Sequence, residues 1–190
     1  MVTRNIVLLV FAGLIATSPL VAQETAAPVA PIAHRDGTHD FDAEFGNWTI
    51  HVKRLMHPLS GASDWVAYDG SKVVTPIWDG KANVAEVKAD GPAGHLHFLA
   101  LRLYDQAARQ WNLNFASAGA GTFGTPLYGE LRNGGVEFIG PDTFNGRSIL
   151  VRFISHEDGR DRATSEQYFS DDGGHTWELN WINKYIRVKG

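Results

Sequence analysis

The stretch LHFLALRLYDQAARQWNLNF, residues 96–115, decides the fold, because it holds two apolar and aromatic runs on either side of a short polar turn. A turn near Gln106 to Arg109 would place three pairs opposite each other: Leu103 and Trp111, Leu101 and Leu113, and Leu99 and Phe115. Because side chains alternate along a strand, this register collects these six residues on one face. The stretch therefore predicts an antiparallel hairpin whose apolar face points inward.

The rest of the chain repeats this pattern at short intervals. Further β-branched and aromatic runs cover residues 48–52, 149–154 and 177–186. Dipeptides that favour tight turns separate the runs: Asp69-Gly70, Asp79-Gly80, Asp90-Gly91, Asn133-Gly134-Gly135, Asn145-Gly146, Asp158-Gly159 and Asp172-Gly173-Gly174. Only residues 40–45 look helical. Evenly spaced strands without crossover helices predict an all-β antiparallel meander, closed as a barrel or folded as a sandwich.

A second hairpin is predicted near the C-terminus. Its apolar face would hold three opposed pairs: Phe169 and Trp177, Gln167 and Leu179, and Ser165 and Trp181. Glu166 would pair with Asn180 on the other face. A slip of one residue would mix polar and apolar side chains on both faces, which favours this register.

The N-terminus has the features of an export signal. Arg4 precedes the apolar run 6–15, which is too short to span a bilayer, and Ala22 offers a cleavage point. We expect a signal peptide over 1–22, a disordered Ala/Pro-rich leader over 23–38 and a single β-barrel domain over 39–190. The alternative is an uncleaved anchor. The mature protein is expected to be periplasmic or secreted by a bacterium, without stable membrane insertion.

Composition narrows the chemistry further. The chain is 44% hydrophobic and 20% charged, carries a formal net charge of −4 and has no cysteine. It therefore has no disulfide, thiolate metal site or thiol nucleophile. No basic stripe is present, so we expect no nucleic-acid partner.

Several motifs resemble those of lipocalins and their calycin relatives. Gly46-Asn47-Trp48 resembles the Gly-x-Trp signature of the first strand, and Arg187 sits where those barrels place an arginine across the tryptophan ring. Other stretches resemble an uncharacterised bacterial calycin-like family known as a domain of unknown function: 39–42, 101–105, 110–111, 170–177 and 180–181. Where that family leads us to expect a tryptophan after Arg152-Phe153, this chain has Ile154-Ser155. The resemblance implies an up-and-down barrel of about eight to ten strands with a short N-terminal helical turn and a cavity.

Two motifs that suggest chemistry are interpreted as structural. Residues 170–177, SDDGGHTW, match the Asp-box of sialidases, but a propeller repeats this motif and here it occurs once. Residues 119–124, GAGTFG, fit G-x-G-x-x-G, yet a strand-like run follows where a dinucleotide site needs a helix. We predict a hairpin turn at the first and a loop near the barrel mouth at the second.

His95 and His97 are the most informative polar residues. Alternation assigns both imidazoles to the apolar face near one end of the barrel, where they would contact a ligand, bind a metal or form an ordinary rim. No third metal ligand can be placed beside them, since His51 points outward and His156 and His175 fall in turns. No metal and no cofactor is therefore predicted. The predicted ligand-binding residues are His95, His97, Trp111, Phe115, Trp181 and Asn183.

The opposite face is the alternative site. It would hold Arg102, Asn112, Asn114, Glu166 and Asn180, and if it faced inward it would line a polar cavity for an acidic or sugar-like ligand. The leading hypothesis is an exported barrel, monomeric or homodimeric, that binds a small hydrophobic or aromatic molecule. The alternatives are an isomerase, hydratase or lyase acting in the cavity through His97 or Glu166, and a haem-binding barrel of the nitrobindin type, which needs an inward histidine near the C-terminal strands.

Overall fold

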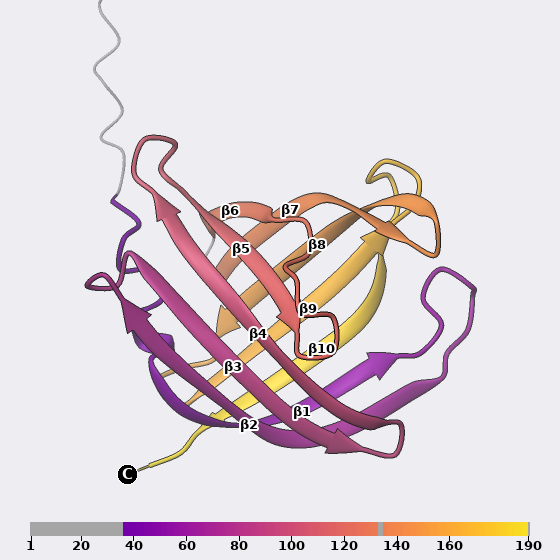
Figure 1. Cartoon of the computed structure of the whole chain (residues 1–190), viewed down its shortest axis with the longest axis horizontal. Helices are drawn as coiled ribbons and strands as arrows, with labels where there is room; N and C mark the ends of the chain where they lie inside the picture. The colour runs from indigo at the N-terminus through magenta and orange to yellow at the C-terminus, as the bar shows by residue number, and fades with distance from the viewer. Residues whose placement is uncertain (1–35, 133–134, 190) are drawn as a thin grey trace, which may run out of the picture. The chain divides into compact units, whose positions relative to one another are not determined.

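Ten antiparallel strands form a closed barrel (Figure 1), in a computed structural model that describes residues 36–132 and 135–189. Each strand pairs with its neighbours in sequence, and β1 closes the barrel against β10. The strands are β1 (Gly46–Leu55), β2 (Trp65–Ile77), β3 (Ala82–Gly91), β4 (Gly94–Asp105), β5 (Gln110–Ser117), β6 (Leu127–Arg132), β7 (Gly135–Phe144), β8 (Arg147–Glu157), β9 (Arg162–Ser170) and β10 (Glu178–Arg187). The predicted up-and-down barrel is confirmed.

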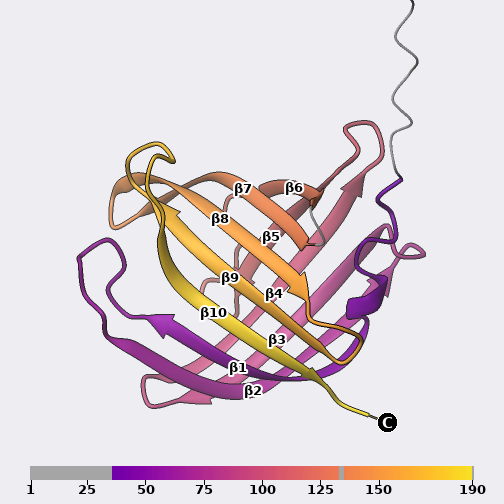
Figure 2. The same cartoon turned by 180° about the vertical axis from the view of Figure 1, so that it is seen from behind.

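The first and last strands meet side by side in the view from behind (Figure 2). Their register sets Trp48 opposite Arg187 and Arg54 opposite Trp181. A single 3-10 turn, η1 (Asp42–Glu44), precedes β1. The short helical turn predicted within residues 40–45 is therefore present.

The β4–β5 hairpin has a different register from the predicted one. Leu103 pairs with Asn112, and Arg102 pairs with Leu113, because the connecting loop has four residues, 106–109, of which Arg109 takes a positive φ of 55°. The faces of β5 are as predicted, but those of β4 are reversed. Arg102 points inward and is 4% exposed, whereas the predicted inward leucines at 99, 101 and 103 are half-buried on the outside.

The β9–β10 hairpin also departs from its predicted register. Tyr168 pairs with Leu179, but beyond a β-bulge at Asn180 the pairs become Gln167 with Trp181 and, two residues on, Ser165 with Asn183. The extra residue in the bulge reverses the alternation along β10. Trp181 therefore lines the interior, while Trp177, which the prediction placed on the same face, packs against Arg152 on the outside.

One predicted turn is part of a strand. Asp69-Gly70 lies within β2, where a Cβ on Gly70 would come within 1.9 Å of the Lys88 carbonyl oxygen in β3. Glycine is required here by close approach of two strands rather than by a turn. The strands β5 and β6 meet along a short seam, in which Trp111 to Leu113 pair with Leu127 to Gly129.

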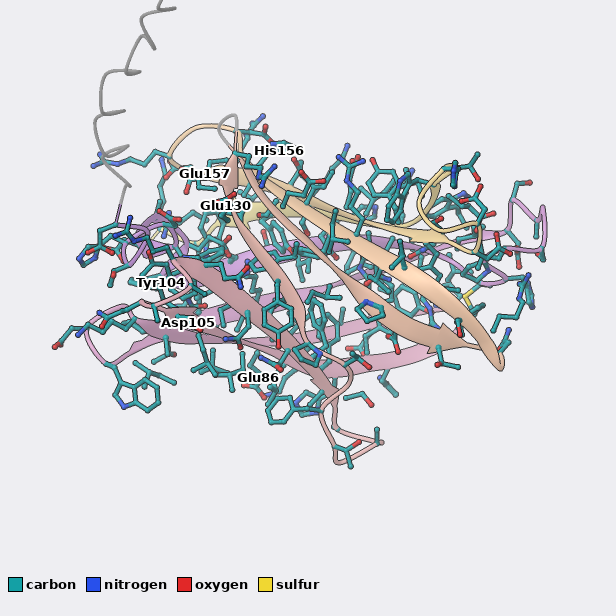
Figure 3. The ribbon with its side chains drawn as sticks, turned by 90° about the horizontal axis from the view of Figure 1, so that it is seen from above. Glu86, Tyr104, Asp105, Glu130, His156 and Glu157 are labelled. Atoms are coloured by element: carbon teal, nitrogen blue, oxygen red, sulfur yellow. The ribbon has the colours of Figure 1, made fainter. Side chains whose placement is uncertain are left out.

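Residues 36–38 pack against one end of the barrel, beside Tyr104 (Figure 3). The Tyr104 hydroxyl accepts a hydrogen bond from the Gly37 amide at 3.0 Å, and Trp111 Nε1 donates to the Gly37 carbonyl at 3.0 Å. The barrel's contacts thus begin within the last residues of the predicted leader. The predicted signal peptide and most of the leader lie outside the described residues. Among residues 36–132 and 135–189, no helix is long and apolar enough to span a bilayer.

Candidate functional site

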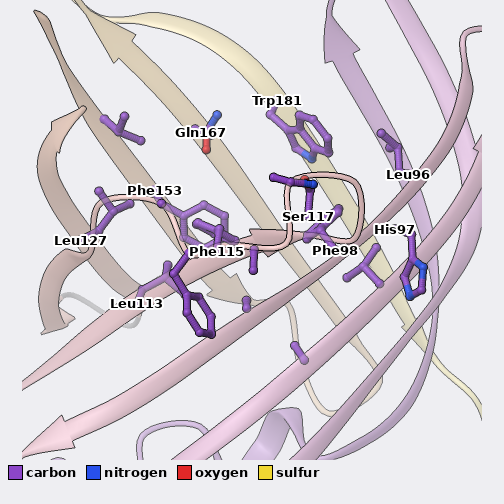
Figure 4. A pocket seen from close by; sticks show the side chains of 18 of the residues that line it. Leu96, His97, Phe98, Leu113, Phe115, Ser117, Leu127, Phe153, Gln167 and Trp181 are labelled. Carbon is purple, nitrogen blue, oxygen red and sulfur yellow. The ribbon is translucent and has the colours of Figure 1, made fainter. Parts of the chain in front are cut away.

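The barrel holds a cavity of about 740 Å³ (Figure 4). Its wall is mostly aliphatic and aromatic: Ala85, Val87, Leu96, Phe98, Ala100, Leu113, Phe115, Leu127, Val151, Phe153, Phe169 and Trp181. Four of the rings touch in series. Phe98 lies 6.0 Å from Trp181 and 6.4 Å from Phe115, and Phe115 lies 5.7 Å from Phe153, between ring centres. Edge-to-face contacts of this kind hold the wall in one arrangement.

The loop after β5 forms part of the lining. Ala116 bridges to Phe123, and the Gly124 amide donates to the Phe115 carbonyl at 2.8 Å, so the loop folds back on the end of its own strand. Residues 117–120, 122–125 and Leu127 all border the cavity. Strand β6 follows the G-x-G-x-x-G segment, so the segment is a loop at the cavity, as predicted, and not a dinucleotide-binding turn.

Three buried charged side chains meet where the cavity ends against η1. Glu44 Oε2 accepts hydrogen bonds from Lys72 Nζ at 2.6 Å and from Arg102 Nη2 at 3.2 Å. Arg102 Nη1 also donates to Asn83 Oδ1 at 3.1 Å, and Ser155 Oγ donates to Glu44 Oε1 at 3.5 Å. All five residues are less than 9% exposed. We call Glu44, Lys72 and Arg102 the floor cluster.

The floor cluster shifts the ionisation of its members. Burial opposes the ionised form of Glu44, but the charges of Arg102 and Lys72 and their hydrogen bonds outweigh it and lower the pKa of Glu44 from 4.5 to about 2. Burial lowers the pKa of Lys72, against the opposing charge of Glu44, and the charge of Arg102 adds to the lowering. Glu44 is therefore a carboxylate at neutral pH, held by hydrogen bonds from Lys72 and Arg102.

A chain of polar side chains links the floor to the middle of the wall. Trp181 Nε1 donates to Asn183 Oδ1 at 2.7 Å, and Asn183 Nδ2 donates to Ser165 Oγ at 2.8 Å. Ser165 in turn shares a hydrogen bond of 2.9 Å with the Tyr185 hydroxyl, and Lys72 Nζ lies 4.1 Å from the centre of the Tyr185 ring. These bonds fix the Trp181 indole and the Asn183 amide in place.

The predicted ligand-binding residues separate into three groups. Phe115, Trp181 and Asn183 line the cavity. Trp111 is 0% exposed and packs edge-on against Phe41 at 4.8 Å, so it belongs to the core of the closed end. The hydrogen bond from Trp111 Nε1 to the Gly37 carbonyl holds the indole at this end of the barrel. The pattern of a hairpin in the sequence does not reveal that contact.

His95 and His97 border the cavity, but their side chains turn outward. Phe98 and Ala100 on β4 point inward, so alternation directs His95 and His97 to the outside. His97 Nε2 lies 2.9 Å from Glu86 Oε1, and His95 contacts Asp90. The inward orientation predicted for both is wrong, because the β4 register differs by one residue. Among the described residues, no three His, Cys, Asp or Glu side chains are grouped to hold a metal ion.

The alternative polar set is dispersed. Of its members, Arg102 is at the cavity floor. Asn112 and Asn114 bond each other and the carbonyls of β4 on the outside, Glu166 accepts from the Tyr168 hydroxyl, and Asn180 is buried in the bulge. Glu44 and Lys72 were not predicted from the sequence as site residues. In the sequence, Lys72 is marked only as a charged residue at an inward position of β2, and Glu44 lies in the short turn before β1. The residues that they contact are distant in sequence.

A solved structure of a known protein supports the fold. The S-type phycobiliprotein lyase CPES from Guillardia theta has a similar structure, with a TM-score of 0.54 and 10% identity over 80% of this chain and 92% of the lyase. The structure of EF1p2_mFAP2b bound to DFHBI aligns with a TM-score of 0.45 and 7% identity over 80% of this chain and 99% of that one. No protein-family model and no curated protein matches the sequence. The similarity to the lyase shows the fold alone, a closed antiparallel β-barrel.

Proposed function

We propose that this protein binds a small molecule with an apolar or aromatic body inside its barrel. The observation that carries the proposal is the cavity of about 740 Å³ with its mostly aliphatic and aromatic wall. Sites for small ligands are concave, mainly apolar and a few hundred to roughly 1,000 Å³ in volume. The ligand body is expected to lie between Trp181 and Phe115, with Asn183 as a polar contact.

The two alternative functions find less support. His97 and Glu166, the acid–base candidates for an isomerase, hydratase or lyase, bond side chains on the outer face. His175, the histidine nearest the C-terminal strands, lies in the Asp-box turn beside the Asp172 carbonyl. An acid–base group has to reach the substrate, and an axial haem ligand has to face the pocket, so binding is the function we propose.

The test uses the neutral fluorescent probe N-phenyl-1-naphthylamine. Binding in the cavity should enhance its emission and quench tryptophan fluorescence. Trp181→Ala should weaken binding by on the order of 1–3 kcal/mol, the transfer value of one large apolar contact. Trp177→Ala is the matched control, because it removes the same side chain from the outer face and should leave the affinity unchanged. If the wild-type protein does not bind this probe or any apolar molecule of similar size, the proposal is wrong.

We also propose that the protein acts in the periplasm or outside the cell. Support comes from Arg4, the short apolar run 6–15 and Ala22, which together have the pattern of a cleaved export signal. N-terminal sequencing of the protein from its host should begin near Gln23. Recovery of the full-length chain from the cytosol would contradict this proposal.

A further inference from the structure

The floor cluster contains more positive than negative side chains. Lys72 and Arg102 share one carboxylate, Glu44, and the side chains of all three are at most 6% exposed. Around the cluster, Asn83, Ser155 and Tyr185 are uncharged polar residues, and the Phe41 ring centre lies 4.2 Å from the Arg102 guanidinium carbon. The exposed Glu157 is a further acidic neighbour, because partial burial and the charge of Glu44 raise its pKa. A buried charge without a counter-charge is costly, so the cluster favours a second anion.

Some donors of the cluster have no acceptor. Among the described residues, Arg102 Nε and Asn83 Nδ2 are buried without a hydrogen-bond partner. Arg102 uses Nη1 and Nη2 for Asn83 and Glu44, and Lys72 Nζ donates to Glu44. Buried polar groups in folded proteins nearly always have a partner. These donors can therefore form hydrogen bonds with an acceptor atom of a bound ligand.

The cavity reaches the Lys72 and Arg102 side chains of the cluster. Lys72, Arg102 and Tyr185 are among its lining residues, together with the apolar wall above them. A ligand that fills the cavity would place one end against two cationic side chains and the rest of its length against Phe115 and Trp181. The protein's formal net charge of −4 opposes anions at long range, so any preference for an anion has to come from such local contacts.

We propose that the ligand is an amphipathic carboxylate, whose apolar body lies along the aromatic wall and whose carboxylate binds Lys72 and Arg102 at the cavity floor. This inference rests on the proposed function and names the class of ligand for the same cavity. Arginine and lysine bind carboxylates through charge-assisted hydrogen bonds, which are stronger than neutral ones. In this arrangement Arg102 is a binding residue, and Glu44 positions it.

The experiment compares decanoate with 1-decanol, which share an apolar chain and differ in the head group. Each should displace N-phenyl-1-naphthylamine from the wild-type protein, and decanoate should bind about ten- to a hundredfold more tightly, the range of a charge-assisted hydrogen bond. Lys72→Met should remove most of this advantage, because it weakens the binding of decanoate far more than the binding of decanol. Lys88→Met is the matched control: Lys88 forms an exposed pair with Glu86 on the outer face, and its loss should leave the advantage intact.

The outcomes separate the two proposals. If neither the probe nor either alkyl ligand binds, the proposed function is wrong. Equal affinities of decanol and decanoate for the wild-type protein would overturn the proposal of a carboxylate ligand. The proposal that the cavity binds an apolar molecule would stand. Arg54, which lies 5.6 Å from the Trp181 ring centre, is the other lining arginine. An advantage that is lost in Arg54→Met but kept in Lys72→Met would place the head group beside Arg54, and would overturn the floor site. Circular dichroism confirms that each variant is folded.

Discussion

The guanidinium carbon of Arg187 lies 4.1 Å from the centre of the Trp48 indole ring, and the two residues are opposite each other in the β1–β10 pair. Arg187 Nη1 also donates to the Phe45 carbonyl at 2.8 Å, and Trp48 Nε1 donates to the Glu44 carbonyl at 2.8 Å. The pair thereby joins the first strand, the last strand and η1. The cation–π contact expected from Gly46-Asn47-Trp48 is confirmed.

Trp48→Ala should destabilise the protein strongly. Trp48 is 3% exposed, so its truncation removes a packed aromatic ring as well as the contact with Arg187, at a cost of about 3–5 kcal/mol. Urea unfolding measures this difference. Trp78→Ala serves as the control, because Trp78 is 70% exposed and its loss should cost less than about 1 kcal/mol. Equal effects of the two substitutions would mean that Trp48 does not close the barrel.

Glu44→Gln should reduce stability most at neutral pH. Removing the charge leaves Lys72 and Arg102 buried without an anion, at a cost of about 3–5 kcal/mol. Because the pKa of Glu44 falls from 4.5 to about 2 on folding, the carboxylate's contribution is fully present above pH 4.5 and is lost as the pH falls toward 2. The free-energy difference between the wild type and the variant should therefore shrink over this range. A difference in the free energy of unfolding that stays constant between pH 6 and pH 2.5 would contradict a lowered pKa of Glu44.

Ala100→Phe should fill the cavity. Ala100 borders the cavity on β4 and is 5% exposed, so a benzyl group there occupies space that a ligand needs. We expect probe affinity to fall about tenfold or more, and overpacking to cost about 1–3 kcal/mol of stability. Leu101→Phe enlarges the next residue, which points to the outer face, and should not change the affinity. Fluorescence titration compares the probe affinities of the two variants. Loss of binding in both would argue against a ligand inside the barrel.

Asp172→Ala should lower the melting temperature more than Asp171→Ala does. Asp172 accepts hydrogen bonds from the Thr176 amide at 2.9 Å, the Thr176 hydroxyl at 2.6 Å and the Ser170 hydroxyl at 2.8 Å, and the Thr176 and Ser170 bonds lower its pKa. Asp171 forms one exposed ion pair with Arg147, a type that contributes little. Thermal melts of both variants give the comparison. A larger effect at Asp171 would show that the Asp-box residue does not hold the turn.

The sequence was sufficient to predict the strands, because strands depend on local signals, and the resemblance to lipocalins implied the barrel and its closure. Turn dipeptides and apolar runs mark most strand ends, and the Trp48–Arg187 pair marks the seam between first and last strands. The position of Phe115 in the wall was also predictable, since the alternation of β5 is regular. The strand ends and the inward position of Phe115 need no knowledge of distant partners.

The inward side of β4 could not be predicted from its own pattern. Its outward residues are the leucines at 99, 101 and 103, whereas Arg102 points inward because Glu44, 58 positions away in sequence, provides its counter-charge. Long-range pairing overrides hydrophobicity here, and the four-residue loop 106–109 sets the register that permits it.

The inward side of β10 depends on one extra residue. Without the bulge at Asn180, Trp177 and Trp181 would share a face, which is what strict alternation predicts. The Asn180 side chain accepts a hydrogen bond from Gln167 at 3.0 Å and so stabilises the bulge within the sheet. A bulge has no fixed sequence pattern, so the separation of the two tryptophans was not available from the sequence.

The short seam between β5 and β6 has a kinetic consequence. Three residue pairs join these strands, and the loop that follows β5 borders the cavity. Breaking so few backbone hydrogen bonds costs less than unfolding any long strand pair, so these strands are expected to separate transiently while the other nine seams stay closed. Those amide protons of residues 127–129 that face β5 should then exchange with solvent ahead of the amide protons in β2 and β3. The rate of this local opening would set how long an enclosed molecule resides in the barrel.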